Sequence, residues 1–170
     1  MAVDSGVLSD HEIEALLGAD AIRTDLPLDE GQVQPASLDL RLAEDAYRLR
    51  ASFLPGKDRT VAAMLQEPGI HMHRIDLTKE GAVLETGCVY LVPLMESLRL
   101  PAGIAARANP KSSTGRIDVF TRLVTNRSRA FDEVPTGYSG PLYLEVSPRT
   151  FPIMVRPGDR LAQIRFKRKK

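Results

Sequence analysis

The sequence predicts a mostly-β domain, a sandwich or distorted barrel, that opens with one short helix. Three observations support this fold class. Twelve prolines and twelve glycines punctuate a chain of 170 residues. Between them lie short runs rich in β-branched and aromatic residues, and only one segment carries a clear helix-start signal. The length is that of one ordinary domain, so we expect residues 1–170 to fold as a single unit.

The helix is expected directly after Ser9. Residues 9–12, Ser-Asp-His-Glu, have the pattern of a capping box, with Ser9 as the N-cap and Glu12 as the third helical residue. Apolar residues then recur at helical spacing in Ile13, Leu16 and Leu17.

The remaining regular elements are expected to be short strands. Leucines at 38, 40 and 42 alternate with polar residues at 37, 39 and 41, which is the period of a strand. A β-rich run at 89–92 is bounded by Gly87 and Pro93. Later β-rich runs cover 118–125, 141–146 and 153–155. We expect the segment 51–86 to be a loop with at most one helical turn, near 61–66.

Charge and cysteine content exclude several classes of protein. The 23 basic and 22 acidic residues nearly cancel, which disfavours a nucleic-acid partner. Cys88 is the single cysteine, so an internal disulfide and the His/Cys/Cys zinc centre of one large class of nucleobase deaminases are both excluded. His71 and His73 would share one face of a strand, but exposed polar positions explain them better than a metal site.

The sequence is expected to contain neither a signal peptide nor a membrane span. The first residues lack the pattern of a signal peptide, and no window approaches the roughly 18 apolar residues of a membrane span. We therefore expect a cytoplasmic protein with no membrane partner. The basic run at 167–170 is expected to be an unstructured, solvated tail.

The segment 109–116, Asn-Pro-Lys-Ser-Ser-Thr-Gly-Arg, is the strongest candidate for an anion site. Lys111 offers a mobile point charge, Arg116 a planar fork, and Ser112 and Ser113 short-range donors to phosphate oxygens. The spacing is not that of a Walker loop, which places Gly-x-x-x-x-Gly-Lys-[Ser/Thr] between a strand and a helix. The segment predicts capture of a nucleotide phosphate, and a solvated surface turn is the alternative interpretation.

Glu145 is the candidate for proton transfer. Alternation along 141–146 puts Leu142 and Leu144 on one strand face, and Tyr143 and Glu145 on the other. A carboxylate beside an aromatic ring in a cleft has its charged form disfavoured by desolvation, which suits it to shuttling protons. An exposed carboxylate on the wet face of a sheet is the alternative interpretation.

Two further segments contain candidate polar ligands. Residues 156–164 form a turn that leads into a strand, where Asp159 is expected to bind its own turn backbone. Arg160 and Gln163 remain as ligands or as interface polar groups. Asp132 precedes the turn formers Pro135 and Gly137 and is expected at the mouth of a loop, where an ordinary turn aspartate is the alternative.

Together these segments resemble the dCTP deaminase branch of the superfamily that also contains the trimeric dUTPases. The resemblance runs from the N-terminal helix to Phe166, and it is greatest to the first half of a long bacterial form that has two related domains in one chain. Four motifs occur in family order: Pro35-Ala36-Ser37-Leu38-Asp39-Leu40-Arg41, then Lys111-Ser112-Ser113-x-x-Arg116, then Gly137-Tyr138-Ser139-Gly140 with Glu145 five residues on, and Arg156-Pro157-Gly158-Asp159-Arg160-Leu161-Ala162-Gln163.

The resemblance implies a dUTPase-like distorted barrel, a homotrimer or higher homo-oligomer with sites between subunits, and Mg²⁺ that accompanies the triphosphate. It implies that Glu145 is the general acid/base, activating water for attack on cytosine C4 with no metal on that water. The phosphate-binding positions fall on Ser112, Ser113 and Arg116, with Lys111 where many members have arginine. Further substrate contacts are expected from Asp132, Tyr138 and Gln163.

Two departures from the family keep other functions open. The stretch between Arg116 and Gly137 looks longer than in the compact bacterial enzymes, and nothing after Phe166 resembles the arm that closes over the nucleotide. We therefore expect that arm to come from elsewhere. A dUTP pyrophosphatase using Asp132 and Tyr138, a bifunctional enzyme that releases dUMP from dCTP, a non-catalytic nucleotide-binding half-domain and a purely structural domain are the alternatives.

Overall fold

A computed structural model describes residues 6–169 of the chain. The helix α1 (Asp10–Gly18) begins after Ser9 as predicted, and both hydrogen bonds of the capping box are present. Ile13 and Leu16 are buried against the main core, so the apolar stripe seen in the sequence attaches this helix to the strands.

The strands form two large sheets and one small one, and within residues 6–169 the paired strands are all antiparallel. The first sheet has the order β5 (His71–Asp76), β4 (Asp45–Leu49), β7 (Val89–Arg99), β11 (Ser139–Pro148) and β9 (Val119–Thr125), and β1 (Ile22–Thr24) also pairs with β7. The second has the order β10 (Glu133–Val134), β8 (Ile104–Pro110), β13 (Ala162–Arg168), β3 (Ser37–Leu40) and β2 (Val33–Gln34). The small one pairs β12 (Ile153–Val155) with β6 (Ala82–Leu84).

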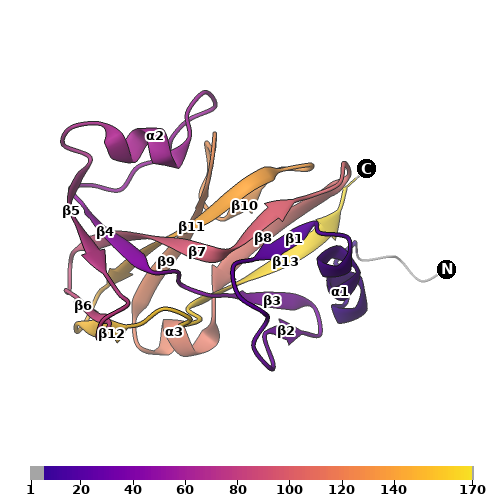
Figure 1. Ribbon diagram of the computed structural model, residues 1–170, viewed down its shortest axis with the longest axis horizontal. Helices are drawn as coiled ribbons and strands as arrows, with labels where there is room; N and C mark the ends of the chain where they lie inside the picture. The colour runs from indigo at the N-terminus through magenta and orange to yellow at the C-terminus, as the bar shows by residue number, and fades with distance from the viewer. Residues whose placement is uncertain (1–5, 170) are drawn as a thin grey trace.

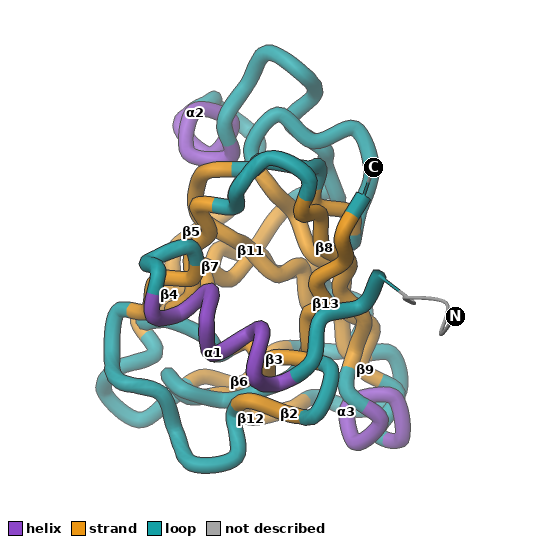
Figure 2. The backbone as a smooth tube through the Cα atoms, turned by 90° about the vertical axis from the view of Figure 1, so that its right-hand side faces the viewer, coloured by secondary structure: helices purple, strands orange, loops and turns teal. Residues whose placement is uncertain are grey.

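The predicted mostly-β fold is confirmed. The strands occupy the middle of the molecule, and α1, α2 (Val61–Gln66) and α3 (Ser112–Arg116) lie at its periphery (Figures 1 and 2). The main core joins both large sheets and includes Leu38, Leu144 and Phe166. A smaller apolar cluster, with Leu91, Tyr143 and part of α2, covers the other side of the first sheet.

The sequence predicted too little regular structure for residues 51–86. The helical turn is present as α2, but the segment also contains β5 and β6. The helix is too short to be stable alone. Val61 and Leu65 are buried in the smaller cluster, so tertiary packing stabilises it.

Pro93 does not end the strand that begins at Val89. β7 continues to Arg99, with β4 paired to residues 89–91 and β1 paired to residues 96–98. Between these two pairings Pro93 O accepts from Ala43 N–H at 2.9 Å and Leu94 bridges to Leu42, so the strand continues past the proline.

The basic run at the end of the described chain is not an unstructured tail. Lys167 and Arg168 belong to β13 and pair with Ala105 and Ile104 of β8. The backbone N–H of Lys169 donates to Gly103 O at 2.7 Å. Lys170 lies outside the described residues. Chain-end charge patterns do not reveal strand pairing, because the partner strand is distant in the sequence.

A buried ion pair ties the two large sheets together. Arg41 follows β3, and its guanidinium Nε donates to Glu96 of β7 at 2.9 Å, while its backbone N–H donates to the same carboxylate at 2.6 Å. Both side chains are almost fully buried. The remaining guanidinium nitrogens donate to Pro27 O and Leu26 O, and Gln32 Nε2 donates to Glu96 at 3.0 Å. Every charged group in this network therefore has partners, which is the condition for tolerating buried charge.

We predict that Arg41→Ala lowers the free energy of unfolding by about 3–5 kcal/mol, because the Glu96 carboxylate would stay buried without its counter-charge. Urea denaturation of wild type and variant measures this. The control is Arg23→Ala, which breaks the exposed pair with Asp20 and should cost no more than about 1 kcal/mol. Equal losses in the two variants would contradict the structural role of Arg41.

Candidate functional site

The predicted phosphate-binding segment forms a short helix fastened to the turn that precedes β13. Lys111 N–H and Thr114 Oγ1 both donate to Leu161 O, at 3.0 and 2.8 Å. Thr114 is buried, whereas Ser112, Ser113 and Arg116 are exposed. The side chains of these three exposed residues form no hydrogen bond or ion pair with other described residues, and they remain available to a ligand.

Lys111 is held by Asp39 of β3. Its ammonium forms an ion pair with Asp39 Oδ2, and Arg160 Nη1 lies 3.5 Å from the same oxygen. Asp39 is fully buried. The first, second and fourth sequence motifs therefore meet at this carboxylate, although they are far apart in the chain.

A cavity of about 620 Å³ opens beside this segment. It is lined by residues 34–37 and 109–112, together with Gln163 and Arg165. The structure thus brings three of the predicted ligands, Lys111, Ser112 and Gln163, around one space. Ser113 and Arg116 lie on the adjoining α3 but do not line this cavity.

Glu145 lies elsewhere, on the face of β11 that carries the smaller apolar cluster. It is buried, and Tyr143 shares its face as the alternation predicts. In the β9–β11 register Arg122 is directly opposite Glu145. Arg122 donates to Glu145 Oε1 through Nη2 at 2.7 Å and Nε at 3.1 Å, and Ser52 Oγ donates to the other oxygen. The carboxylate is therefore fixed in position by two arginine N–H groups on one oxygen and a hydroxyl on the other.

Arg122 is itself held by aromatic stacking. Its guanidinium carbon lies 3.7 Å from the ring centroid of Phe131 and 5.3 Å from that of Phe120. Its Nη2 also donates to Ser52 Oγ at 2.6 Å. Ser52 and the partly exposed Arg122 side chain close the solvent side of Glu145.

The other two predicted ligands, Tyr138 and Asp132, are engaged by the backbone. Tyr138 OH donates to Pro141 O at 2.7 Å and accepts from Asn126 N–H at 3.0 Å, and burial raises the pKa of this hydroxyl. Asp132 Oδ1 accepts from Leu123 N–H at 2.8 Å. Burial raises the pKa of the Asp132 carboxyl, although the hydrogen bond from Leu123 and the nearby Arg107 and Arg122 act in the opposite direction. Both residues hold the connection between β9 and β11 in shape.

The predicted site residues therefore form two groups within one chain. One group surrounds the cavity beside Lys111, and the other lies around Glu145, which lines neither that cavity nor a second one described below. Among residues 6–169 no cluster of three or more His, Cys, Asp or Glu side chains suited to a metal ion is found. Within the same residues no helix is long and apolar enough to cross a membrane.

Residues 4–170 match the family described as the 2'-deoxycytidine 5'-triphosphate deaminase N-terminal domain. The chain belongs to this family. A dCTP deaminase, dUMP-forming, from Beutenbergia cavernae is 34% identical over 166 residues, which cover 94% of this chain and 78% of that protein.

Solved structures agree with this assignment. The 2'-deoxycytidine 5'-triphosphate deaminase of Agrobacterium tumefaciens is 59% identical with a TM-score of 0.92, covering 96% of this chain and 48% of that one. This chain therefore spans about half of the Agrobacterium chain. A dUTPase from phage phi11 of S. aureus, 12% identical with a TM-score of 0.52, covers 88% of this chain and 90% of its own, and shares the fold.

Sequence reasoning did not find the partners of Glu145. Arg122 and Ser52 precede it by 23 and 93 residues. The only sequence signal for Arg122 is its position in a β-rich run, on the same strand face as Phe120. Strand pairing decides which residue lies opposite, and the sequence pattern does not contain that information.

We predict that Asp132→Asn is at least as stable as wild type at neutral pH, and that Asp132→Ala is about 1–3 kcal/mol less stable. Asparagine retains the acceptor for Leu123 N–H, whereas alanine leaves that N–H unpaired and tolerates poorly the positive φ of 66° at this position. Because the folded-state pKa of Asp132 is raised, its contribution to stability is present below the unfolded pKa and is lost as pH rises through the folded pKa.

The advantage of Asp132→Asn over wild type should therefore appear only as pH rises from about 4 through that window. Urea unfolding of the three proteins at a series of pH values checks both effects. A stability difference between Asn and Asp that is constant with pH would contradict the assignment.

Proposed function

We propose that this chain is a catalytic domain for hydrolytic deamination of dCTP, with Glu145 as the general acid/base. The fixed, buried carboxylate of Glu145, gripped by Arg122 and Ser52 beside Tyr143, is the observation that carries this proposal. The names of the curated relatives support the substrate, and the resemblance in four motifs supports the role of Glu145.

In this proposal Glu145 removes a proton from a water molecule that attacks C4 of cytosine. It then returns protons to the departing amino group, so that water and the base become a uracil and ammonia. Arg122 keeps the carboxylate aimed at the reacting atoms and stabilises its charge. Ser52 lies on the solvent side of Glu145. The cytosine base can therefore reach the carboxylate only after the hydrogen bond between Ser52 and Glu145 breaks and the loop that carries Ser52 moves.

The triphosphate would be bound by Ser112, Ser113 and Arg116, with Lys111 anchored on Asp39. This donor set fits phosphate oxygens and does not fit a metal ion, because the carboxylate that contacts the segment already pairs with two cations. We propose that Mg²⁺ arrives with the triphosphate and neutralises part of its charge, and that no metal ion binds the water that attacks C4.

The complete site is proposed to form between two copies or two related domains. Of the two cavities within residues 6–169, neither is lined by both Lys111 and Glu145. In this proposal a nucleotide whose phosphates bind beside Lys111 of one unit has its base at Glu145 of the next. The half-length coverage of the Agrobacterium chain is consistent with a second related unit in such proteins. A homotrimer or a mixed assembly of domains meets this requirement.

A bifunctional reaction that ends in dUMP is the second candidate. The curated relatives carry the description dUMP-forming. Asp132 is the carboxylate that would activate water in a dUTP pyrophosphatase. Its Oδ1, however, already accepts a backbone hydrogen bond from Leu123. We therefore propose deamination as the reaction of this chain and pyrophosphate release as an activity to be tested separately.

Product analysis distinguishes these reactions. With dCTP as substrate we expect ammonia, and pyrophosphate in addition only if the enzyme is bifunctional; dUTP is supplied in a parallel reaction. Pyrophosphate without ammonia in the dCTP reaction would overturn the deaminase assignment. Tight dCTP binding without any turnover at high enzyme concentration would favour a non-catalytic half-domain.

We predict that Glu145→Gln lowers ammonia release at least about 100-fold, because the amide cannot accept and return the proton. Binding of dCTP, measured by calorimetry, should change little. Glu133→Gln is the matched control, since this exposed carboxylate lies outside the group formed by Glu145, Arg122 and Ser52. A Glu145→Gln enzyme that keeps more than half of its turnover would refute the catalytic role.

We predict that Arg116→Gln weakens dCTP binding about 10- to 100-fold, as expected for the loss of one charged hydrogen bond worth about 1.5–3 kcal/mol. The melting temperature should stay unchanged, because the Arg116 side chain is exposed and has no partner among the described residues. Calorimetric titration with dCTP and thermal melts test the two statements. Unchanged dCTP affinity would remove Arg116 from the phosphate site.

A further inference from the structure

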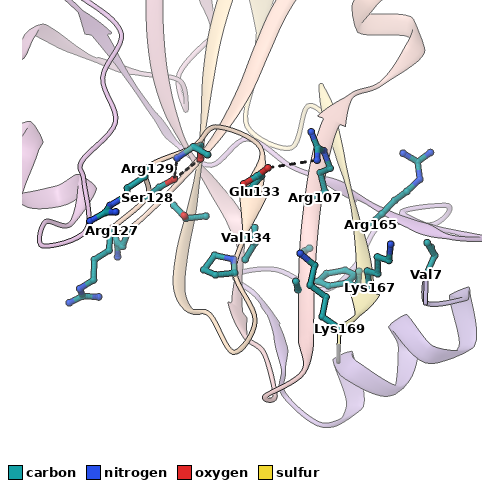
Figure 3. Close-up of a pocket in the computed structure, with 17 residues that line it drawn as sticks. Val7, Arg107, Arg127, Ser128, Arg129, Glu133, Val134, Arg165, Lys167 and Lys169 are labelled. Carbon is teal, nitrogen blue, oxygen red and sulfur yellow. Dashed lines mark hydrogen bonds and ion pairs between the residues drawn. The ribbon is translucent and has the colours of Figure 1, made fainter. Parts of the chain in front are cut away.

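A second cavity, of about 670 Å³, is lined neither by the residues 111–116 nor by Glu145. Four segments supply most of its lining: the start of β8, β10, the end of β13 and the loop 125–130 (Figure 3). Its volume is that of a typical ligand pocket, which ranges from about 300 to 1,000 Å³. Nothing in the proposed deamination uses this space.

The lining of this cavity is strongly cationic. Six basic side chains and one carboxylate, Glu133, take part, although the whole chain has a net charge of only +1. The basic residues are Arg107, Arg127, Arg129, Arg165, Lys167 and Lys169. Positive charge is therefore concentrated here, and mutual repulsion of the cations would be relieved by an anion.

Most of these cations lack a side-chain partner among the described residues. Arg107 lies 3.8 Å from Glu133, and Arg165 donates to Asn109 at 2.9 Å. The side chains of Arg127, Arg129, Lys167 and Lys169 form no ion pair or hydrogen bond within residues 6–169. Figure 3 shows Lys169 extending from the end of β13 towards Val134, across from the loop that carries Arg127 and Arg129.

The backbone beneath these cations is ordered by hydrogen bonds. Lys167 pairs with Ala105 of β8 and bridges to Val7, and Lys169 N–H donates to Gly103 O at 2.7 Å. In the loop, Arg127 N–H donates to Arg59 O at 2.8 Å and Ser128 Oγ to Ala130 O at 2.5 Å. The backbone that carries the cations is thus already fixed, which reduces the backbone conformational entropy lost when a ligand binds.

We propose that this cavity is a second anion site, separate from the substrate phosphate site, that binds a small polyphosphate. Several cations on opposing walls match a ligand with adjacent negative groups better than a single phosphate. A concave pocket on a chain that is nearly neutral overall suits a small anion better than a nucleic-acid duplex. Of the predicted phosphate ligands, none lines this cavity, and Arg165 is the one residue common to both cavities.

Calorimetric titration of the protein with inorganic tripolyphosphate at low salt tests this proposal. Wild type should show two sites per chain. The triple variant Arg129→Gln, Lys167→Gln and Lys169→Gln should lose one of them, with affinity at that site reduced at least about tenfold. The double variant Lys111→Gln and Arg116→Gln should lose the other. The control triple variant Arg50→Gln, Lys57→Gln and Lys79→Gln removes the same charge from exposed positions outside both cavities and should retain both sites.

If the cavity triple variant and the control triple variant bind tripolyphosphate equally weakly, the proposal is overturned, because the loss of three positive charges anywhere on the surface would explain the result. Orthophosphate that binds at this site as tightly as tripolyphosphate would also overturn it. Melting temperatures check that each variant is folded, and the pair Lys167→Gln and Lys169→Gln replaces the triple variant should that one unfold. The result does not depend on deamination, since Glu145→Gln should keep both tripolyphosphate sites.

Discussion

The buried polar face of β3 is the constraint on which the rest of the molecule depends. Leu38 and Leu40 enter the main core from one face, while Asp39 and the following Arg41 place charges inside the protein on the other. Arg41 joins the second sheet to the first through Glu96, and Asp39 fixes Lys111 and Arg160. One strand therefore couples the stability of the fold to the geometry of the phosphate-binding segment, since each buried charge on this strand needs a counter-charge.

Burial of β11 on both faces has a comparable effect on the proposed catalytic centre. Leu142 and Leu144 pack into the main core, and Tyr143 packs into the smaller cluster beneath α2. Glu145 is thereby carried into an apolar environment, and it stays there because Arg122 and Ser52 complete its hydrogen bonds. Residues 51–66, which the sequence predicted as a loop with at most one helical turn, help to make this environment.

Positive charge is distributed in two places that are adjacent in space and distinct in chemistry. The phosphate-binding segment combines Lys111 and Arg116 with hydroxyl donors on a short helix. The second cavity combines longer cationic side chains from three elements with little neutralising charge. Arg165 lines both cavities, so occupancy of one can alter the electrostatic field at the other. This arrangement is invisible in the overall charge, because acidic residues elsewhere cancel it.

Local patterns in the sequence determined the capping of α1, the alternation of β3 and β11, the turn contact of Asp159 with Arg156 and the residues of the phosphate-binding segment. These features depend on neighbours within a few positions, so periodicity and turn chemistry reveal them. Tertiary structure alone decided that Arg122 faces Glu145, that Asp132 and Tyr138 bind backbone groups, and that the chain-end lysines line a cavity. Those outcomes depend on strand register between distant segments, which no local pattern encodes.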